Sequence, residues 1–246
     1  MLIALFSDIH GNREALDACL ADARRRNAER FVFLGDLVGY GADPAYVVDV
    51  IAQLRREGAV VIKGNHDSAI VRPRDTMSSY ARIAIEWTRN QLDPAQKDFL
   101  ANLPLSVSWG DTLFVHAEAS HPAKWIYISQ ISEAERSMRA AHQRITLSGH
   151  VHRPCVFQMS EKKATIALVP TTDVPIGLEK SHKWHAIIGS VGQPRDEIPT
   201  AAYALYDEEA GLITFVRAKY DIDAAARKIR AAGLPEFLSQ RLFLGR

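Results

Sequence analysis

Five short apolar runs divide the chain, and each of them ends on side chains that can bind a metal ion or move a proton. The runs begin at Leu2, Phe31, Ala59, Thr112 and Ile145. Short apolar runs bounded by glycine and polar residues predict buried strands. The residues at their carboxyl ends carry carboxylate, amide and imidazole groups, and they are Asp8, His10, Asp36, Asn65, His66, Asp67, His116, His150 and His152.

The intervals between the first three runs carry helical patterns. Apolar residues recur at helical spacing over 16–23 and 47–54, as on the buried face of a helix. Asp43 suits an N-cap, Pro44 the first helical position and Gly58 the end of the second helix. Alternation of strand and helix predicts a mostly parallel sheet with right-handed crossovers. Its strand ends would lie along one edge, where such sheets bind ligands.

The middle of the chain predicts helices that cover a sheet. Residues 76–92 carry apolar side chains at helical spacing, and a shorter helix is expected over 93–103. Ser132 and Glu135 have the spacing of a capping box, which predicts another helix before the fifth strand.

Strand-like runs dominate the second half of the chain. They cover 164–169, 184–188, 202–206 and 212–216. The last two flank the turn Asp207-Glu208-Glu209-Ala210-Gly211, which predicts a hairpin. The short links favour a second sheet, largely antiparallel, stacked on the first with helices outside. The predicted fold class is therefore α/β, in the broad sense that includes α+β, with two stacked mixed sheets.

The C-terminal tail is apolar and has to be covered. A helix is expected over 223–232, and the tail 233–246 beyond it carries several large apolar side chains. The tail either folds back onto its own chain or makes a contact between subunits of a homo-oligomer. No linker divides the sequence, so a single domain is expected over 1–246.

Composition excludes several classes of function. The formal net charge of +1 gives no signature for nucleic acid or an anionic membrane. Cys19 and Cys155 are too few for a disulfide framework and are expected to be reduced. The first apolar run is broken by Asp8 and is not a signal peptide, and no run has membrane-spanning length. A cytoplasmic location is the default expectation.

The donor set at the strand ends favours two metal ions. Carboxylate and imidazole groups without a thiolate suit Mn, Fe, Co, Ni or Zn better than Ca or a structural zinc. Two cations at close range need a shared anionic ligand, and Asp36, alone after its glycine, is the candidate for that bridge. Such a pair lowers the pKa of a bridging water and neutralises a transferring phosphoryl group.

Together these motifs resemble those of the calcineurin-like metallophosphoesterases. The matching blocks follow the family's order, and they are Asp8-x-His10, Gly35-Asp36, Gly64-Asn65-His66-Asp67, His116 and Gly149-His150-x-His152. The segment 190–196 and the helical stretch that ends at Leu103-Pro104 resemble the small bacterial and archaeal phosphodiesterase branch. The resemblance spans nearly the whole chain and implies a four-layer αββα sandwich, in agreement with the two sheets inferred from the residues.

The resemblance also implies roles for individual residues. One ion would be held by Asp8, His10, Asp36 and His152, and the other by Asp36, Asn65, His116 and His150. His66 would face the scissile phosphate as a general acid or charge stabiliser, with Asp67 fixing its tautomer and Asn12 near the phosphate oxygens. Arg153 follows His152 directly and is expected either to contact a phosphate oxygen or to pair with an acid.

The sequence therefore predicts a metal-dependent phosphohydrolase. The expected reaction is hydrolysis of a phosphodiester by in-line attack of a metal-bridging hydroxide, with His66 protonating the leaving oxygen. Manganese is the ion expected to support activity in assays. The expected substrate is a small-molecule phosphoester, and a nucleotide derivative is one option. A phosphomonoesterase or phosphoprotein phosphatase would use the same residues. A protein-binding scaffold of the same fold is a third possibility, which the complete ligand set and His66 disfavour.

Three features beyond the blocks leave alternatives open. Glu118 stands where relatives often have a small residue, and it either repels anionic substrates or points away from the site. The pair Trp125 and Tyr127, and the stretch 180–184, either roof the site or cover edges of the core.

Overall fold

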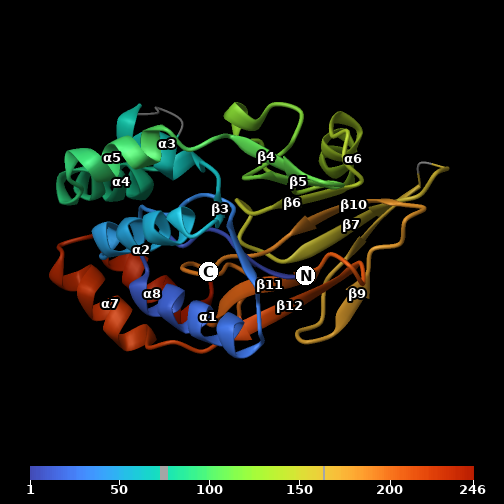
Figure 1. Cartoon of the computed structure of the whole chain (residues 1–246). Helices are drawn as coiled ribbons and strands as arrows, with labels where there is room; N and C mark the ends of the chain where they lie inside the picture. The colour runs from blue at the N-terminus through green and yellow to red at the C-terminus, as the bar shows by residue number, and fades with distance from the viewer. Residues whose placement is uncertain (73–76, 163) are drawn as a thin grey trace.

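Two six-stranded sheets form the centre of the protein, and eight helices among the described residues flank them (Figure 1). The computed structural model describes residues 1–72, 77–162 and 164–246. The predicted fold class is confirmed. Within the described residues, none of the helices combines the length and the apolar character that crossing a membrane requires.

The first sheet joins the parallel strands of the N-terminal part to three antiparallel strands. In sheet order its strands are β3 (Val60–Val61), β2 (Arg30–Phe33), β1 (Leu2–Phe6), β11 (Ala201–Asp207), β12 (Leu212–Ala218) and β9 (Pro175–Gly177). Strand β1 pairs with β2 in parallel and with β11 antiparallel. The β11–β12 hairpin, expected in the second sheet, therefore extends the first one. Its residues alternate between two buried faces, so burial pattern alone could not assign it to either sheet.

The second sheet contains the strands that deliver the histidines. In sheet order its strands are β4 (Ser106–Trp109), β5 (Thr112–Val115), β6 (Ile145–Ser148), β10 (Lys183–Ile187), β7 (Cys155–Met159) and β8 (Thr165–Leu168). Strands β5, β6 and β10 are parallel, and the outer strands are antiparallel. The predicted largely antiparallel sheet is thus mixed, because β5 and β6 belong to it and not to the N-terminal sheet.

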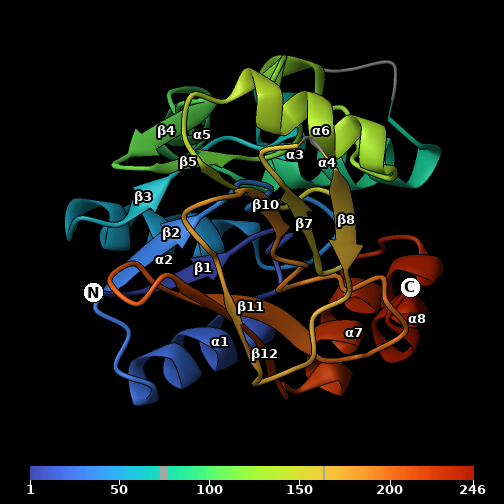
Figure 2. The same cartoon turned by 90° about the vertical axis from the view of Figure 1, so that its right-hand side faces the viewer.

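Helices α1 (Arg13–Arg25) and α2 (Pro44–Arg56) pack on the first sheet. Helices α7 (Ile222–Ala231) and α8 (Glu236–Leu244) pack on each other, with α7 against α1, and helices α3 (Asn65–Val71), α4 (Ser79–Gln91) and α5 (Pro94–Ala101) form a further group beside α2. Helix α6 (Ile131–Ala140) packs on β7, β8 and β10 of the second sheet (Figure 2). The expected helix over 76–92 corresponds to α4, although Thr76 lies outside the described residues.

Helix α6 starts from a different capping box than the sequence suggested. Its N-cap is Gln130, and Glu133 accepts hydrogen bonds from the Gln130 and Ser129 amides at 3.0 and 2.6 Å. Glu135 pairs instead with Arg139 one turn later. The sequence has a glutamate at both 133 and 135. The path of the preceding loop decides which of the two accepts hydrogen bonds from the amides at the start of the helix.

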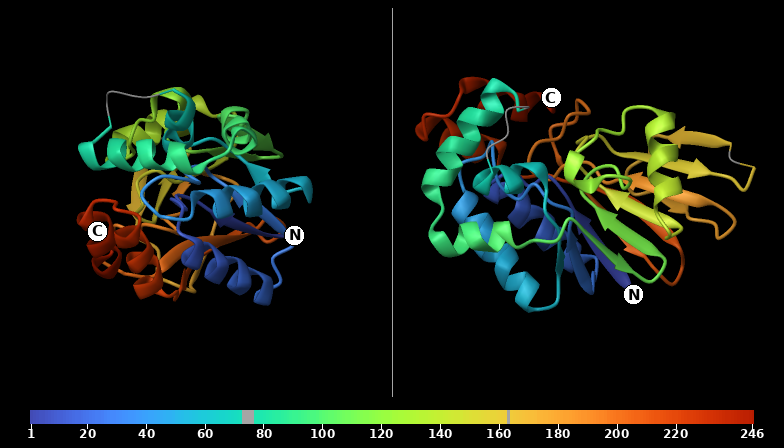
Figure 3. Two further views of the ribbon diagram at one scale, coloured as in Figure 1. Left: turned by 90° about the vertical axis from the view of Figure 1, so that its left-hand side faces the viewer. Right: turned by 90° about the horizontal axis from the view of Figure 1, so that it is seen from above.

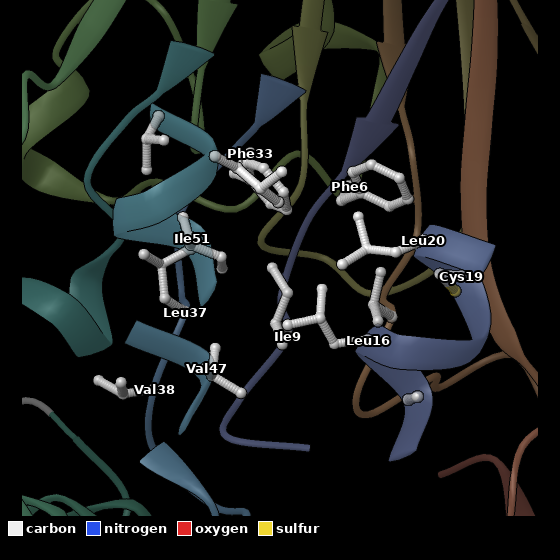
Figure 4. Packing of buried hydrophobic residues seen from close by; sticks show 14 of the residues in the cluster. Phe6, Ile9, Leu16, Cys19, Leu20, Phe33, Leu37, Val38, Val47 and Ile51 are labelled. Carbon is white, nitrogen blue, oxygen red and sulfur yellow. The ribbon is translucent and has the colours of Figure 1, made fainter. Parts of the chain in front are cut away.

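Two apolar layers hold the sheets and helices together. One lies between the sheets and includes Leu5, Phe114 and Leu147. The other lies between the first sheet and helices α1 and α2, where Phe6 stacks on Phe33 at 5.2 Å between ring centroids (Figure 4). Burial of each such side chain contributes about 1.5–3 kcal/mol, so the strand ends are held on a rigid base.

The C-terminal tail folds back onto its own chain. Leu234, Leu238 and Leu242 are buried against Ala81 of α4 and Ala226 of α7. The C-terminal helices accordingly lie beside the segment of α4 (Figure 3, left). This packing brings α8 next to residues that surround the strand ends.

Acid should destabilise the fold through His185 of β10. This ring is fully buried, its Nε2 lies 2.8 Å from the Ser148 Oγ, and its Nδ1 has no hydrogen-bond partner among the described residues. Burial lowers the pKa of His185 to about 3. The folded protein therefore keeps the ring neutral, whereas the unfolded chain takes up a proton near its ordinary pKa of about 6.5. The associated stability is complete above that value and is lost as the pH falls toward 3.

Urea unfolding of the metal-free protein at pH 7 and pH 5 measures this effect. The contribution of His185 to the loss should be about 2 kcal/mol. The variant His185→Gln should lose about that much less than the native sequence over the same interval. Equal losses in the two proteins would contradict the assignment.

Candidate metal centre

Strand ends from both sheets meet at one place in the fold. Asp8 and Asp36 follow β1 and β2, Asn65 opens α3 after β3, and the second sheet supplies His116 after β5 and the pair His150 and His152 after β6. Backbone hydrogen bonds tie the loops together, among them Asp8 N to Gly35 O at 3.0 Å and Gly149 N to His116 O at 3.0 Å. Apart from Asn65, which is partly exposed, these side chains are buried.

The backbone at the strand ends adopts a conformation that non-glycine residues rarely accept. Positive φ angles of 51–66° occur at Asp8, His10, Asp36, His150 and His152. Left-handed backbone at such residues costs free energy of order 1–3 kcal/mol each and persists only where the surroundings impose it. It turns these side chains inward from the strand ends.

The first group of facing donors contains Asp8, His10, Asp36 and His152. Their ligand atoms all lie within 4.8 Å of one another. The Nε2 of His152 lies 3.1 Å from the Asp8 Oδ1, and the Nε2 of His10 lies 3.7 Å from the Asp36 Oδ2. These separations leave room for one cation in contact with all four residues.

The second group contains Asp36 again, with His116 and His150. Its ligand atoms also lie within 4.8 Å of one another. The Asp36 Oδ2 is 3.4 Å from the His116 Nε2, and the Asn65 Oδ1 is 3.2 Å from that same nitrogen. The structure thus brings all seven of the predicted metal ligands together in two groups that share Asp36.

Hydrogen bonds behind the histidines aim one ring nitrogen at the centre. The Nδ1 atoms of His10, His116 and His152 donate to the backbone carbonyls of Val38, Leu34 and Gln193 at 3.1, 2.7 and 2.6 Å. Each of these rings therefore presents Nε2 inward. His150 is reversed, since its Nε2 donates to the Trp125 carbonyl at 3.0 Å and its Nδ1 is left for a ligand. Bonds of this kind fix ring orientation at metal sites.

Two buried contacts are unfavourable unless a cation lies between the atoms concerned. The Nε2 atoms of His10 and His152 lie 3.2 Å apart. Both rings donate through Nδ1 and are neutral at ordinary pH, so two lone pairs face each other. Asp8 Oδ2 accepts from Ser7 Oγ and His150 N, whereas the fully buried Oδ1 has no hydrogen-bond partner in the described part of the chain. A divalent cation satisfies these atoms, so the residues fit a metal ion.

The electrostatics of the site favour charged carboxylates. Burial opposes ionisation of Asp36, but the nearby His116 and His66 outweigh it and hold the pKa of Asp36 well below its usual range. Burial also works against the charged form of His116, yet Asp36 raises the pKa of that imidazole to about 9. A cation at His116 Nε2 must displace a proton, so affinity at the second group increases with pH.

A pocket of about 540 Å³ opens above the two groups. Its lining comprises Tyr40, Asn65, His66, Met77, Ser78, Ala81, Lys124, Trp125, Tyr127, His150, Arg195 and Arg241. Tyr127 stacks on the His150 ring with centroids 4.0 Å apart. Trp125 and Tyr127 therefore border the site, whereas none of the residues 180–184 lines this pocket.

Comparison with known proteins decides the family. The family model described as the calcineurin-like phosphoesterase superfamily domain matches residues 1–211. The chain belongs to this family. Members use divalent metals, and membership implies hydrolysis of phosphoesters.

Individual relatives agree over the full length of this metallophosphoesterase. An uncharacterized protein of Methanocaldococcus jannaschii, MJ0912, is 36% identical over 253 residues, which cover 100% of this chain and 98% of that protein. The crystal structure of a metallophosphoesterase from Sphaerobacter thermophilus is 33% identical, with a TM-score of 0.88 and full coverage of both chains. A hypothetical protein of Pyrococcus horikoshii, PH1004, shares the fold at 20% identity, with a TM-score of 0.82 and coverage of 100% and 98%.

His66 of this metallophosphoesterase belongs to neither of the two donor groups, and the Asp67 carboxylate is bonded elsewhere. The His66 ring lines the pocket, and its Nδ1 has no hydrogen-bond partner among the described residues. The Asp67 carboxylate instead accepts from the amides of Leu37 and Gly64, both at 2.9 Å. Helix α3 starts at Asn65, so Asp67 turns back toward the backbone of its own N-terminus. The expectation that Asp67 fixes the His66 tautomer by direct contact is therefore wrong.

Asn12 and Arg153 are also engaged elsewhere. The Asn12 oxygen caps α1 by accepting from Ala15 N at 3.1 Å, and its nitrogen donates to Gly192 O at 3.0 Å. Arg153 is exposed and donates through Nε to the Arg195 carbonyl at 2.6 Å, and no acidic side chain of the described residues pairs with it. Neither side chain lines the pocket, and contact of either with substrate stays a prediction.

Several pocket residues were not assigned to the site from the sequence, among them Arg195, Tyr40 and Arg241. Arg195 belongs to the segment 190–196, whose resemblance to a family branch was a signal for it. Tyr40 follows Asp36 closely, but tyrosine there carries no specific pattern. Arg241 comes from the C-terminal tail, and nothing local marks it. Glu118 is fully buried, accepts from Ser120 Oγ at 2.6 Å and faces Arg136 at 3.4 Å, so it points away from the pocket.

Replacing Asp36 should weaken both ion sites together. The native protein should bind two Mn²⁺ per chain, since Asp36 Oδ2 faces both groups of donors. Asp36→Asn should lower the affinity for both ions. Loss of a residue that only hydrogen-bonds to a metal ligand lowers metal affinity roughly 10–100-fold, and loss of the ligand itself should cost at least as much. Asp8→Asn is the control, because it removes a ligand from the first group alone and should leave one ion bound. Calorimetric titration with Mn²⁺ measures both. Retention of two ions by Asp36→Asn would refute the shared ligand.

Proposed function

We propose that this metallophosphoesterase hydrolyses phosphodiesters with two divalent cations held by the two groups of donors. The observation that carries the proposal is the position of Asp36. Its Oδ1 accepts from His66 N at 2.8 Å, so its Oδ2 is left to face His10 and His116 from opposite groups. An anionic oxygen shared in this way supports a pair of cations at close range.

In the proposed site each ion has four protein ligands, and Asp36 is common to both. Asp8, His10, Asp36 and His152 hold one ion, and Asp36, Asn65, His116 and His150 hold the other. Two such ions supply an activated water and neutralise charge on the phosphoryl group. The mixture of carboxylate, amide and imidazole suits Mn²⁺, which is our choice for activity assays.

His66 is our candidate for the group that protonates the leaving oxygen. It lines the pocket, lies edge-on to the His10 ring with centroids 4.7 Å apart, and also contacts the Tyr40 ring at 4.6 Å between centroids. Burial lowers its pKa to about 4, although the Asp36 carboxylate works in the opposite direction. The free ring is therefore neutral near pH 7. An anionic phosphoester beside it favours the protonated form, so substrate binding would charge the acid.

Arg195 takes the place that the sequence suggested for Arg153. Its Nη2 donates to Gln193 Oε1 at 3.0 Å, and its buried Nε has no hydrogen-bond partner among the described residues. No aspartate or glutamate side chain in the described ranges pairs with it. The backbone amide of Arg195 donates to the His152 carbonyl at 3.2 Å, which ties this guanidinium to a metal ligand. We infer that it contacts the scissile phosphate.

The extent of the pocket supports a diester over a monoester. Beyond the metal-binding groups its lining includes Lys124, Trp125 and Tyr127 from the loop after β5, and also Tyr40 and Arg241. The lining therefore offers several side chains to the two substituents of a diester, whereas a monoester has only one substituent. Phosphomonoesterase activity is the second candidate, because the cationic lining also suits a dianion.

His66→Ala should keep both ions and the fold while it slows turnover about 10²–10⁴-fold, the usual effect of losing a positioned general acid. The loss should be smaller for an ester with an acidic phenol than for an alkyl ester, because a phenolate leaves without a proton. Rates with both esters and metal content measure this. His142→Ala is the control, since His142 is exposed and outside the pocket. Equal losses with both esters would refute the acid role.

A comparison of model esters tests the proposed substrate class. The Mn²⁺-loaded protein should hydrolyse bis(p-nitrophenyl) phosphate with a higher kcat/KM than p-nitrophenyl phosphate. The reverse order would favour the monoesterase. Absence of hydrolysis of either ester, in protein with both ions bound, would favour a binding scaffold.

A further inference from the structure

The walls of the pocket carry more positive charge than a single phosphodiester requires. Lys124, Arg195 and Arg241 line the pocket, and no aspartate or glutamate occurs among its described lining residues. Arg195 lies near the metal ligands, as argued above. The other two cations come from different parts of the chain and need a separate explanation.

Arg241 reaches the pocket from outside the matched family domain. The family model ends at residue 211, whereas Arg241 belongs to α8. Leu238 and Leu242 on the same helix are buried against α4 and α7. At the end of α8, Glu197 N donates to Gly245 O at 2.9 Å, which ties the helix to the segment that follows Arg195. The position of Arg241 beside the pocket is therefore fixed by packing.

Among the described residues, Arg241 is held by main-chain and ring contacts and has no side-chain acid as a partner. Its Nε donates to the main-chain oxygen of Arg246, and its guanidinium lies over the Phe237 ring at 5.1 Å. No aspartate or glutamate side chain of the described ranges forms an ion pair with it. Burial, and then the like charge of Arg195, lower the pKa of Arg241 to about 10, so it remains charged near pH 7. Both guanidinium groups line the same pocket, which has no aspartate or glutamate among its described lining residues, so the pocket favours an anionic ligand.

We propose that Arg241 binds a second phosphate group of the substrate. This inference rests on the proposed function, in which the first phosphate lies at the metal centre beside Arg195. The substrate class is accordingly a phosphoester that carries another phosphate on one of its substituents. A guanidinium suits this role because it donates two parallel hydrogen bonds to a phosphate.

Binding of paired model ligands tests the proposal. The ligands are alkanediol bisphosphates with two to six carbons and the alkyl monophosphates of matching length, titrated calorimetrically into the Mn²⁺-loaded protein. At one or more lengths the bisphosphate should bind about tenfold or more tightly than its monophosphate, as expected for a charge-assisted hydrogen bond. Equal affinities at every length would overturn the proposal.

Two variants assign the effect to Arg241. Arg241→Gln should bind both ligands equally, with unchanged affinity for the monophosphate. Arg227→Gln removes a charge from the same pair of C-terminal helices, but Arg227 is exposed and outside the pocket, so it should keep the native preference. A preference that survives in Arg241→Gln, or disappears in Arg227→Gln, would overturn the assignment.

Unfolding curves and Mn²⁺ titrations of each variant show that a change in affinity comes from the pocket itself. Since the readout is binding, it needs no turnover. A protein that prefers bisphosphates but hydrolyses no ester would refute the proposed function and keep the second phosphate site. A protein that hydrolyses diesters without that preference would support the proposed function and refute the second phosphate site.

Discussion

The buried Asp36 carboxylate between two groups of imidazoles is the interaction on which the rest of the site depends. One oxygen is fixed by the amide of His66, and the other faces both groups. The same residue therefore sets the separation of the groups and the start of α3, which places His66 in the pocket. Nearby histidines keep the pKa of Asp36 low despite burial, so the shared ligand is anionic at any ordinary pH.

This arrangement requires the backbones of two sheets to approach closely. A side chain at Gly64 would collide with the Asp36 carboxylate, and one at Gly149 would collide with Ser7 and Asp8. The left-handed turns at five ligand residues follow from the same crowding, because each strand must stop abruptly and direct a side chain inward. The free energy stored in these turns is offset by the apolar layers beneath them and by any cation that binds.

Much of this site could be predicted from sequence, because each ligand directly follows an apolar run and the strand ends converge in an α/β fold. Contacts that depend on tertiary geometry could not. Asp67 accepts hydrogen bonds from backbone amides because α3 begins two residues earlier. The spacing from Gly64 to Asp67, which is that of an N-cap and the third helical residue, was the sequence signal for this contact. Arg153 and Arg195 lie side by side, yet only the fold decides which one reaches the pocket. Arg241 is brought there by packing of an apolar tail, and a hairpin buried on both faces had no pattern that could assign it to a sheet.

Anomalous diffraction from crystals grown with Mn²⁺ would locate the ions relative to Asp36. Two peaks are expected, one on each side of the Asp36 Oδ2, with His10 and His152 at the first and His116 and His150 at the second. His66 should contact neither ion. A single peak, or two peaks without a common contact to Asp36, would contradict the shared role of this carboxylate.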